Sequence, residues 1–237
     1  MQKAVVLFSG GQDSSTCLLY ALTHYAHVWT LGISYGQKHS VELACRKTIL
    51  DILKQDRDRF TGSLEEDHVI DLKDLATLTD SALTNDKPIV MGANGLPTSF
   101  VPGRNVIFLS LAAALAYDRG ADTIIAGMSQ VDYSGYPDCR EETLKSMTQT
   151  LSLGLNSPIH IEAPLMHLSK AATWALANEL GGEWAINMLL EHTATCYRGV
   201  HNKRHAWGYG CGECPACVLR AKGYAEFRDM LHNNRLE

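Results

Sequence analysis

The sequence lacks the long apolar run of about 20 residues that a membrane-spanning helix requires. We also expect no export signal, because the opening residues MQKAVVLFSGG hold only five apolar residues in succession. A surplus of positive charge is missing too: 21 Lys and Arg stand against 26 Asp and Glu, a net charge of −5. We therefore expect a cytoplasmic protein that binds no membrane and no nucleic acid, although a local basic patch stays open.

A disulfide framework is also not expected, because the chain has an odd number of cysteines, seven, and we expect no export signal. Three cysteines are scattered, and four crowd the C-terminal region with the spacing C-x2-C-x2-C preceded by one upstream cysteine. Four thiolates so close together suit a closed, tetrahedral and therefore structural Zn²⁺ site. An iron–sulfur cluster, free thiols or a histidine in place of one ligand are the alternatives. The predicted zinc ligands are Cys196, Cys211, Cys214 and Cys217.

Apolar runs alternate with stretches of helical periodicity along the first four fifths of the chain. The predicted strands are apolar throughout, which indicates a parallel sheet buried on both faces. We expect an α/β fold with a doubly wound, mostly parallel sheet in residues 1–190 and a zinc-binding helical appendage in residues 191–237. The predicted strands are 3–8, 27–35, 68–72, 122–127 and 159–164, and the predicted helices are 14–25, 40–54, 105–120, 139–153, 169–181, 183–191 and 216–231, with a long loop at 79–103.

The stretch LFSGGQDSST lies between the first predicted strand and the first predicted helix. Two glycines allow the backbone to approach a ligand closely, and the N–H groups at a helix start favour an anion, so a phosphate or pyrophosphate is the expected ligand. Neither the G-x-x-x-x-G-K-[ST] loop nor G-x-G-x-x-G is present. The simpler interpretation is a glycine turn followed by a serine cap.

The letters SGGQDSS resemble the S-G-G-x-D-S signature of the PP-loop ATP pyrophosphatases, which cleave ATP between the α and β phosphates. SYGQKH (34–39), VPGRN (101–105), DYSGYPDCR (132–140) and TCYRG…GCGECPACVLRAKG (195–223) extend the resemblance over essentially the whole chain. Together they resemble the 7-cyano-7-deazaguanine synthase family. The resemblance implies 7-carboxy-7-deazaguanine, ammonia and Mg²⁺-bound ATP as substrates, with AMP and diphosphate released on the way to a nitrile for queuosine biosynthesis.

The resemblance also implies roles for individual residues. Asp13 orients the loop or contacts Mg²⁺, or else only stabilises the helix start. Arg104 pairs with a phosphate or the substrate carboxylate, and Lys170 neutralises the transferring phosphate; surface exposure is the alternative for both. The expected ATP-binding residues are Phe8, Ser9, Gly10, Gly11, Gln12, Asp13, Ser14, Ser15, Thr16, Cys17 and Leu18.

The DYSGYPDCR loop follows the fourth predicted strand and should overhang the same sheet edge. The carboxylates suit the N–H groups of a guanine-type ring and the tyrosines suit its flat face. A loop stabilised by its own tyrosines is the alternative, and Cys139 is either a nucleophile or a small buried thiol. The expected substrate-binding residues are Asp132, Tyr133, Tyr136 and Asp138.

One departure from compact versions of the family is the longer, basic segment 197–210, which is a solvated insertion, a lid or a subunit contact. A tRNA thiolation enzyme with the same loop, a relative that attaches the deazapurine to a macromolecule, and a cysteine-rich binding module are the rival functions. We expect a homodimer, although the sequence itself carries no signal for oligomeric state, ammonia source or the pathway served.

Overall fold

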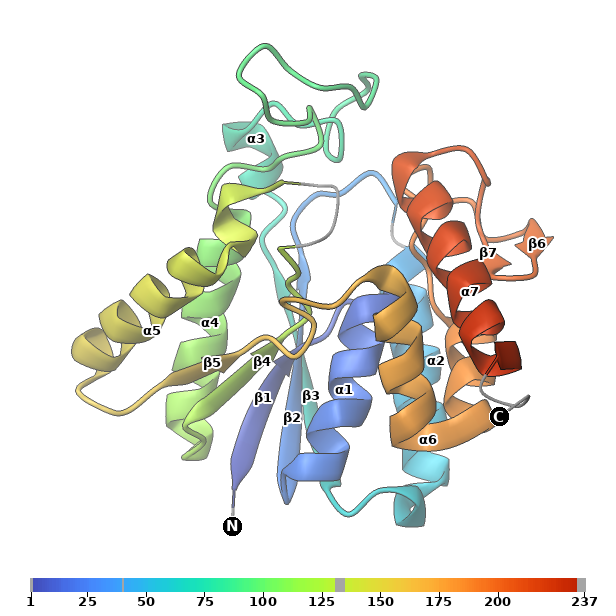
Figure 1. Ribbon diagram of the computed structural model, residues 1–237. Helices are drawn as coiled ribbons and strands as arrows, with labels where there is room; N and C mark the ends of the chain where they lie inside the picture. The colour runs from blue at the N-terminus through green and yellow to red at the C-terminus, as the bar shows by residue number, and fades with distance from the viewer. Residues whose placement is uncertain (1, 40, 131–134, 234–237) are drawn as a thin grey trace.

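The computed structural model describes residues 2–39, 41–130 and 135–233. Five parallel strands form one sheet in the order β3-β2-β1-β4-β5 (Figure 1). The order reverses direction between β1 and β4, which makes the sheet doubly wound, as predicted. The strands are β1 (Lys3–Leu7), β2 (His27–Ser34), β3 (Ser63–Asp71), β4 (Thr123–Ala126) and β5 (His160–Glu162).

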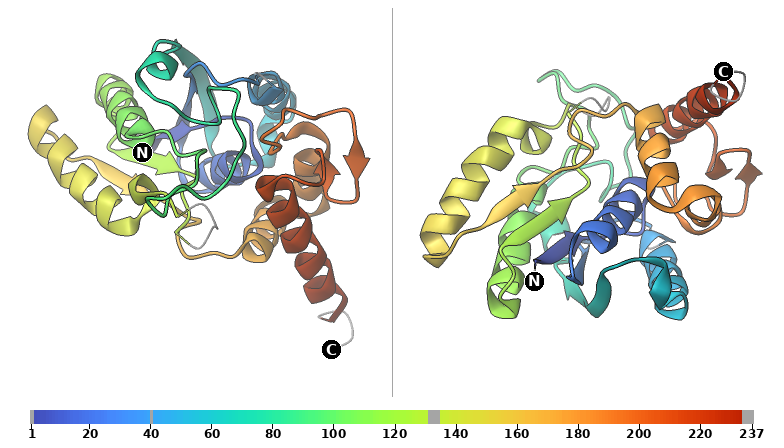
Figure 2. Two further views of the ribbon diagram at one scale, coloured as in Figure 1. Left: turned by 90° about the horizontal axis from the view of Figure 1, so that it is seen from above. Right: turned by 60° about the horizontal axis from the view of Figure 1, so that its bottom comes forward.

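Helices cover both faces of this sheet (Figures 1 and 2). Ala4 and Val6 of β1 pack into a core with α1, α2, α6 and α7, whereas Val5 between them packs into a second core with α4 and α5. β1 is therefore buried on both sides, which explains its unbroken apolar run. The helices are α1 (Gln12–His24), α2 (Val41–Gln55), α3 (Leu75–Leu78), α4 (Arg104–Arg119), α5 (Glu141–Leu155), α6 (Lys170–His192) and α7 (Pro215–Asn233).

Most boundaries lie close to the predicted ones. α6 is interrupted at Gly182, whose backbone leaves the helical region (φ 59°, ψ −152°), so the two helices predicted at 169–181 and 183–191 are both present. Residues 79–103 form a loop with a single isolated bridge between Met91 and Pro97. None of the described helices combines the length and the apolar character that a bilayer crossing needs.

Besides the short helix α3, which was not predicted, two features differ from prediction. β3 begins at Ser63, five residues before the predicted start at 68, because the acidic run Glu65–Asp67 hides a strand that lies at the sheet edge. These acids are paired: His27 Nδ1 lies 2.7 Å from Glu65 Oε1, and Arg46 binds Asp67. The segment 197–210 also contains an unpredicted hairpin of β6 (Arg204–His205) and β7 (Gly208–Tyr209).

The C-terminal residues share a core with the sheet domain. Trp174 of α6 is fully buried, and its ring stacks on Phe227 of α7 at 6.4 Å and meets Tyr224 edge-on at 5.0 Å. Trp207 belongs to the same core. The division at residue 190 stays a prediction, and the packing of α7 on α6 joins the two predicted parts.

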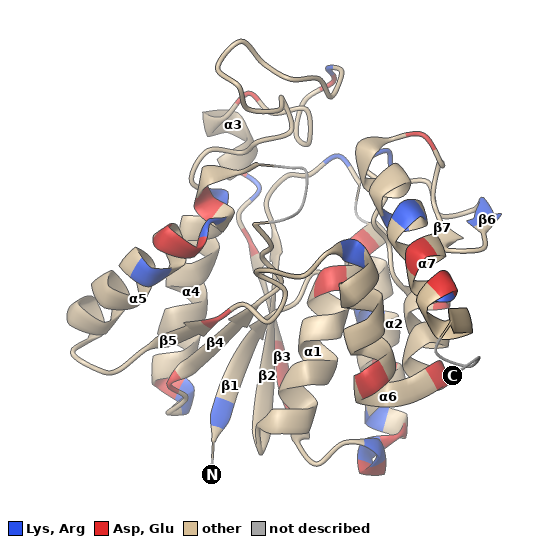
Figure 3. Ribbon diagram, in the orientation of Figure 1, with Lys and Arg blue, Asp and Glu red and all other residues tan. Residues whose placement is uncertain are grey.

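Charged side chains of both signs are interspersed over the helices (Figure 3). This mixture agrees with the modest net charge of −5.

We predict that Trp174→Ala lowers the free energy of unfolding by about 3–5 kcal/mol, because it leaves a cavity between α6 and α7. Urea denaturation of the variant measures this. Tyr117→Ala, which truncates a ring that is 56% exposed on α4, serves as the control and should change stability by about 0.5 kcal/mol or less. Equal effects of the two substitutions would contradict the assigned core.

Candidate functional site

The glycine–serine loop, defined here as residues 8–14, connects the end of β1 to the first turn of α1. Gly10 has a left-handed φ of +94°, and a Cβ there would clash with the carbonyl oxygen of Glu42 and lie 2.7 Å from the amide nitrogen of Arg46. The start of α2 therefore packs directly on this loop, and only glycine fits at the contact.

Hydroxyl groups hold the loop in shape. The amide of Gly11 donates to Ser9 Oγ at 3.2 Å, and Ser9 Oγ lies 3.0 Å from Ser14 Oγ. Ser14 and Ser15 both donate to the carbonyl of Gly11, at 3.2 and 2.7 Å. The N-cap residue Gly11 supplies no side-chain cap, so the N-terminal amides of α1 are available to an anion.

The loop and the helices α2, α4, α6 and α7 line a cavity of about 520 Å³, a size typical of small-molecule sites. Phe8, Ser9, Gly11, Gln12 and Ser14 line it, and their role in binding ATP stays a prediction. Ser15, Thr16, Cys17 and Leu18 lie behind the loop with no exposed surface, and their role in the ATP site stays a prediction. Apolar residues of the long loop, Leu83, Ile89, Val90, Met91 and Pro97, complete the wall.

Gln12 is the residue whose chemistry points to a ligand. Its side chain is 2% exposed, and neither Nε2 nor Oε1 has a hydrogen-bond partner among the described residues. A buried, unpartnered amide costs about 1–3 kcal/mol, so a bound molecule with a donor and an acceptor would restore this energy.

Asp13 and Lys170 form an ion pair at the edge of the cavity. Lys170 Nζ lies 2.8 and 2.9 Å from the two carboxylate oxygens of Asp13, and Lys170 is only 9% exposed. A Cβ on Gly223 of α7 would lie 2.6 Å from Lys170 Cβ, so α7 presses on the lysine stem. The structure thus brings together two residues predicted as catalytic that are 157 positions apart, and it shows that Lys170 is buried.

Arg104 stands at the start of α4 and lines the same cavity. Its Nη1 donates to the hydroxyl of Tyr35 at 3.2 Å, and its guanidinium lies over the rings of Tyr35 (5.3 Å) and Tyr136 (6.0 Å). One hydrogen bond and two cation–π contacts hold the Arg104 guanidinium at the cavity wall, where an anionic group can reach it.

The predicted substrate-binding residues have separate environments. Asp132 and Tyr133 lie outside the described residues. Tyr136 lines the cavity, and its hydroxyl is 2.8 Å from Ser99 Oγ. Asp138 is 6% exposed and accepts a hydrogen bond from the amide of Asn105 at 3.1 Å, so it caps the first turn of α4.

Cys139 also lines the cavity. Asn105 Nδ2 donates to its sulfur at 3.2 Å. The two roles predicted for this cysteine, nucleophile and buried thiol, both stay open.

Glu42, which our sequence analysis overlooked, also lines the cavity, from the first turn of α2. Burial raises the pKa of its carboxyl to about 7, with Asp13 acting in the same direction and Arg104 and the Ser9 hydroxyl opposing. A signal was available, because Glu42 lies three positions after the SYGQKH motif, near the start of a predicted helix.

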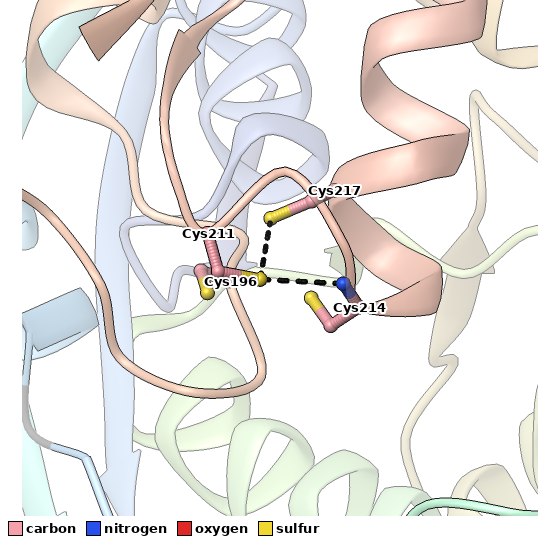
Figure 4. Close-up of side chains that lie close together, drawn as sticks. All are labelled: Cys196, Cys211, Cys214 and Cys217. Atoms are coloured by element: carbon pink, nitrogen blue, oxygen red, sulfur yellow. Dashed lines mark hydrogen bonds between the residues drawn. The ribbon is translucent and has the colours of Figure 1, made fainter. Parts of the chain in front are cut away.

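The four C-terminal cysteines converge as predicted (Figure 4). All their sulfurs lie within 4.8 Å of one another, and Cys211 and Cys217 are 3.8 Å apart. Four sulfurs at about 2.3 Å from a central ion in a tetrahedron are about 3.8 Å apart, so the donor set fits a metal ion. Hydrogen bonding from Cys217 lowers the pKa of Cys214 to about 4, and the amide of Cys214 donates to Cys211 Sγ at 3.2 Å.

Arg220, one turn after Cys217 in α7, is completely buried. It donates to the carbonyls of Trp207 (3.0 Å) and Leu189 (2.9 Å) and to Thr195 Oγ1 (2.8 Å). Burial lowers its pKa to about 10, against the opposing charges of Asp13, Cys217 and Cys45, so the side chain remains a cation at neutral pH.

The doubly wound sheet, the S-G-G-x-D-S loop at the end of β1 and the cavity beside it define a protein of the PP-loop ATP pyrophosphatase class. A family model described as "Queuosine biosynthesis protein QueC" matches residues 3–228. The chain belongs to this family.

Curated relatives match over nearly their whole length. A 7-cyano-7-deazaguanine synthase of Rhodopseudomonas palustris (strain BisB18) is 54% identical, over 95% of this chain and 94% of the relative. One of Leptothrix cholodnii is 55% identical, over 94% of each chain. Among solved structures, a 4-thiouridine synthetase–RNA complex with bound ATP gives a TM-score of 0.49 at 19% identity, over 96% of this chain and 53% of that chain, which is too remote to carry a functional argument.

We predict that Cys214→Ser removes the bound metal and lowers the melting temperature together, because metal binding contributes to folding free energy. Elemental analysis and a melting curve measure both. Cys17→Ser, a substitution in the α1 core, is the control: it should lower stability but keep the metal. A Cys214→Ser protein with full stability and no metal would contradict a structural role.

Proposed function

We propose that the protein is an ATP-dependent ligase that converts 7-carboxy-7-deazaguanine and ammonia to 7-cyano-7-deazaguanine and releases AMP and diphosphate. One observation carries this proposal: relatives named for that synthesis are 54–55% identical over 94–95% of the chain. The family description places the product in queuosine biosynthesis.

The proposed chemistry explains why two ATP molecules are consumed for each product. A carboxylate is a poor electrophile, because oxide would have to leave. Transfer of AMP to the acid expels diphosphate and creates a good leaving group, which ammonia then displaces to give an amide. Transfer of a second AMP to the amide oxygen allows that oxygen to leave and the nitrile to form. The protein contributes mainly by positioning the reactants and stabilising phosphate charge.

The cavity supplies groups for each part of this reaction. The amides of the glycine–serine loop would hold the β and γ phosphates, and Lys170, oriented by Asp13, would stabilise charge on the phosphate being transferred. Arg104 would bind a phosphate or the substrate carboxylate. Tyr136 and the apolar wall suit a flat deazapurine ring, and Asp132, Tyr133 and Asp138 remain proposed ring contacts.

Two metals belong to the proposal. Mg²⁺ would enter with the ATP phosphates. Zn²⁺ is proposed for the four-cysteine cluster, because an all-thiolate tetrahedral set suits zinc and no redox step is required. With every ligand position filled by protein, its role is structural.

A tRNA thiolation enzyme would need a reactive cysteine pair. In the part of the chain that the structure describes, the cavity cysteines are Cys139 and Cys196, and Cys196 belongs to the metal cluster. This arrangement favours the deazapurine synthase. The relative that transfers the deazapurine to a macromolecule remains the second candidate. We propose a cytoplasmic homodimer that acts on small molecules rather than nucleic acid.

We predict that incubation with 7-carboxy-7-deazaguanine, ammonium and Mg²⁺-ATP yields two AMP for each nitrile, with the amide visible in a single turnover. Each oxygen lost from the acid requires one activation. Mass spectrometry and nucleotide chromatography measure the ratio. ADP as the nucleotide product would refute the mechanism, since it would mean cleavage between the β and γ phosphates.

We also predict that Asp13→Ala abolishes AMP formation while the fold is kept. Loss of the carboxylate removes two charge-assisted hydrogen bonds from the buried Lys170 ammonium, so stability should fall by about 1–3 kcal/mol. AMP release and far-UV circular dichroism test both statements. Asp118→Ala, which breaks an exposed pair with Arg119 on α4, is the control and should retain full turnover. A folded Asp13→Ala protein that retains full turnover would remove Asp13 from the mechanism.

A further inference from the structure

The carboxyl of Glu42 borders the glycine–serine loop. A Cβ placed on Gly11 would lie 3.6 Å from Glu42 Oε1, and the carbonyl of Glu42 lies against Gly10. The side chain shares the cavity with Asp13, Arg104 and Lys170. It therefore lies where the proposed phosphate and substrate sites meet, and none of the roles given above uses it.

The charged groups around the Glu42 carboxyl lie on α1, α4 and α6 as well as on its own helix, α2. Asp13 of α1 is already neutralised by Lys170 of α6, with both carboxylate oxygens engaged. Arg104 of α4 is the cation that acts on Glu42. On its own helix, Cys45 is buried and Arg46 points to Asp67 of β3. The other titratable groups that line the cavity are Tyr35, Lys38, His39, Tyr136, Cys139, Cys196 and Tyr197.

The proposed reaction needs a base at one atom. Ammonia has three N–H bonds and the nitrile nitrogen has none, so three protons must leave the same nitrogen. Adenylation of the carboxylate, by contrast, removes no proton. Asp13 has both oxygens bonded to Lys170 and is poorly placed to accept protons.

We propose that Glu42 is the general base that removes protons from the reacting nitrogen in both halves of the reaction. This inference rests on the proposed function. In the first half, the nitrogen lone pair forms the C–N bond, the C–O bond to AMP breaks with its electrons remaining on AMP, and one N–H proton passes to the Glu42 carboxylate.

In the second half, the amide oxygen displaces diphosphate from ATP, and two N–H protons then leave in turn. The electron pairs of those N–H bonds become the additional C–N bonds as AMP departs, which leaves the nitrile. Glu42 carries one proton at a time and returns each to solvent, to which the residue is partly exposed. A base with a pKa of about 7 is well matched to this cycle at neutral pH.

Two assays separate proton removal from adenylation. The first is exchange of labelled diphosphate into ATP with 7-carboxy-7-deazaguanine and no ammonia, which reports adenylation of the acid alone. The second is nitrile formation from the 7-carboxamide and ATP across pH, which avoids the ionisation of ammonium. Glu42→Gln keeps the shape and removes the base. Glu142→Gln is the matched control, because Glu142 stands in the first turn of α5 and is exposed.

We expect Glu42→Gln to slow nitrile formation by about 10²-fold or more while diphosphate exchange stays within about twofold of the unmodified protein. The unmodified protein should lose activity as the pH falls through about 7, because the base works only when ionised, and Glu42→Gln should lack this acid limb. Glu42→Asp should be slow but keep the limb, and Glu142→Gln should behave as the unmodified protein.

Equal loss of exchange and nitrile formation in Glu42→Gln would overturn the inference, since it would assign Glu42 to phosphate binding or folding. An unchanged acid limb in Glu42→Gln would overturn it too. If the unmodified protein shows no diphosphate exchange with the acid, the proposed function itself fails, and the inference fails with it.

Discussion

The ion pair between Asp13 and Lys170 links α1 to α6, two helices that are far apart in the sequence. Asp13 stands in the first turn of the helix after β1, and Lys170 begins α6. Lys170 is in turn pressed by Gly223 of α7, which begins between the cysteines of the metal cluster. A chain of contacts therefore runs from the cluster through α7 to the glycine–serine loop. The position of the loop depends on a charge pair whose ammonium group is buried by this packing.

Arg220 shows why the cluster and the core belong together. A fully buried guanidinium costs much solvation energy, and its hydrogen bonds go to two carbonyls and one hydroxyl, which carry no charge. A metal held by four thiolates would carry a net negative charge one helical turn away. With such a metal bound, the cation would stabilise the cluster and the cluster would offset the burial of the cation; the same side chain joins α7 to the end of α6 and to Trp207.

The sheet could be predicted because its central strands are apolar on both faces: Val5 packs into one core and Val6 into the other. The cysteine cluster could be predicted because its ligands are close in sequence. The start of β3 could not be predicted from the sequence. Its acidic side chains, such as Asp67, are neutralised by partners on other elements, such as Arg46, that are distant in the chain. Glu42 was missed for a related reason: a glutamate in a helix usually faces water, and only tertiary packing places it beside Gly11. The burial of Lys170 had the same origin.

The contact between Gly223 and Lys170 also bears on the order in which the chain is synthesised. The glycine–serine loop leaves the ribosome well before α7, the helix that packs against Lys170 where it pairs with Asp13. A nascent chain can form β1 and β2 early and still lack a completed nucleotide site. The proposed nucleotide site is therefore complete only after α7 has emerged, so nascent chains that lack α7 would not consume ATP.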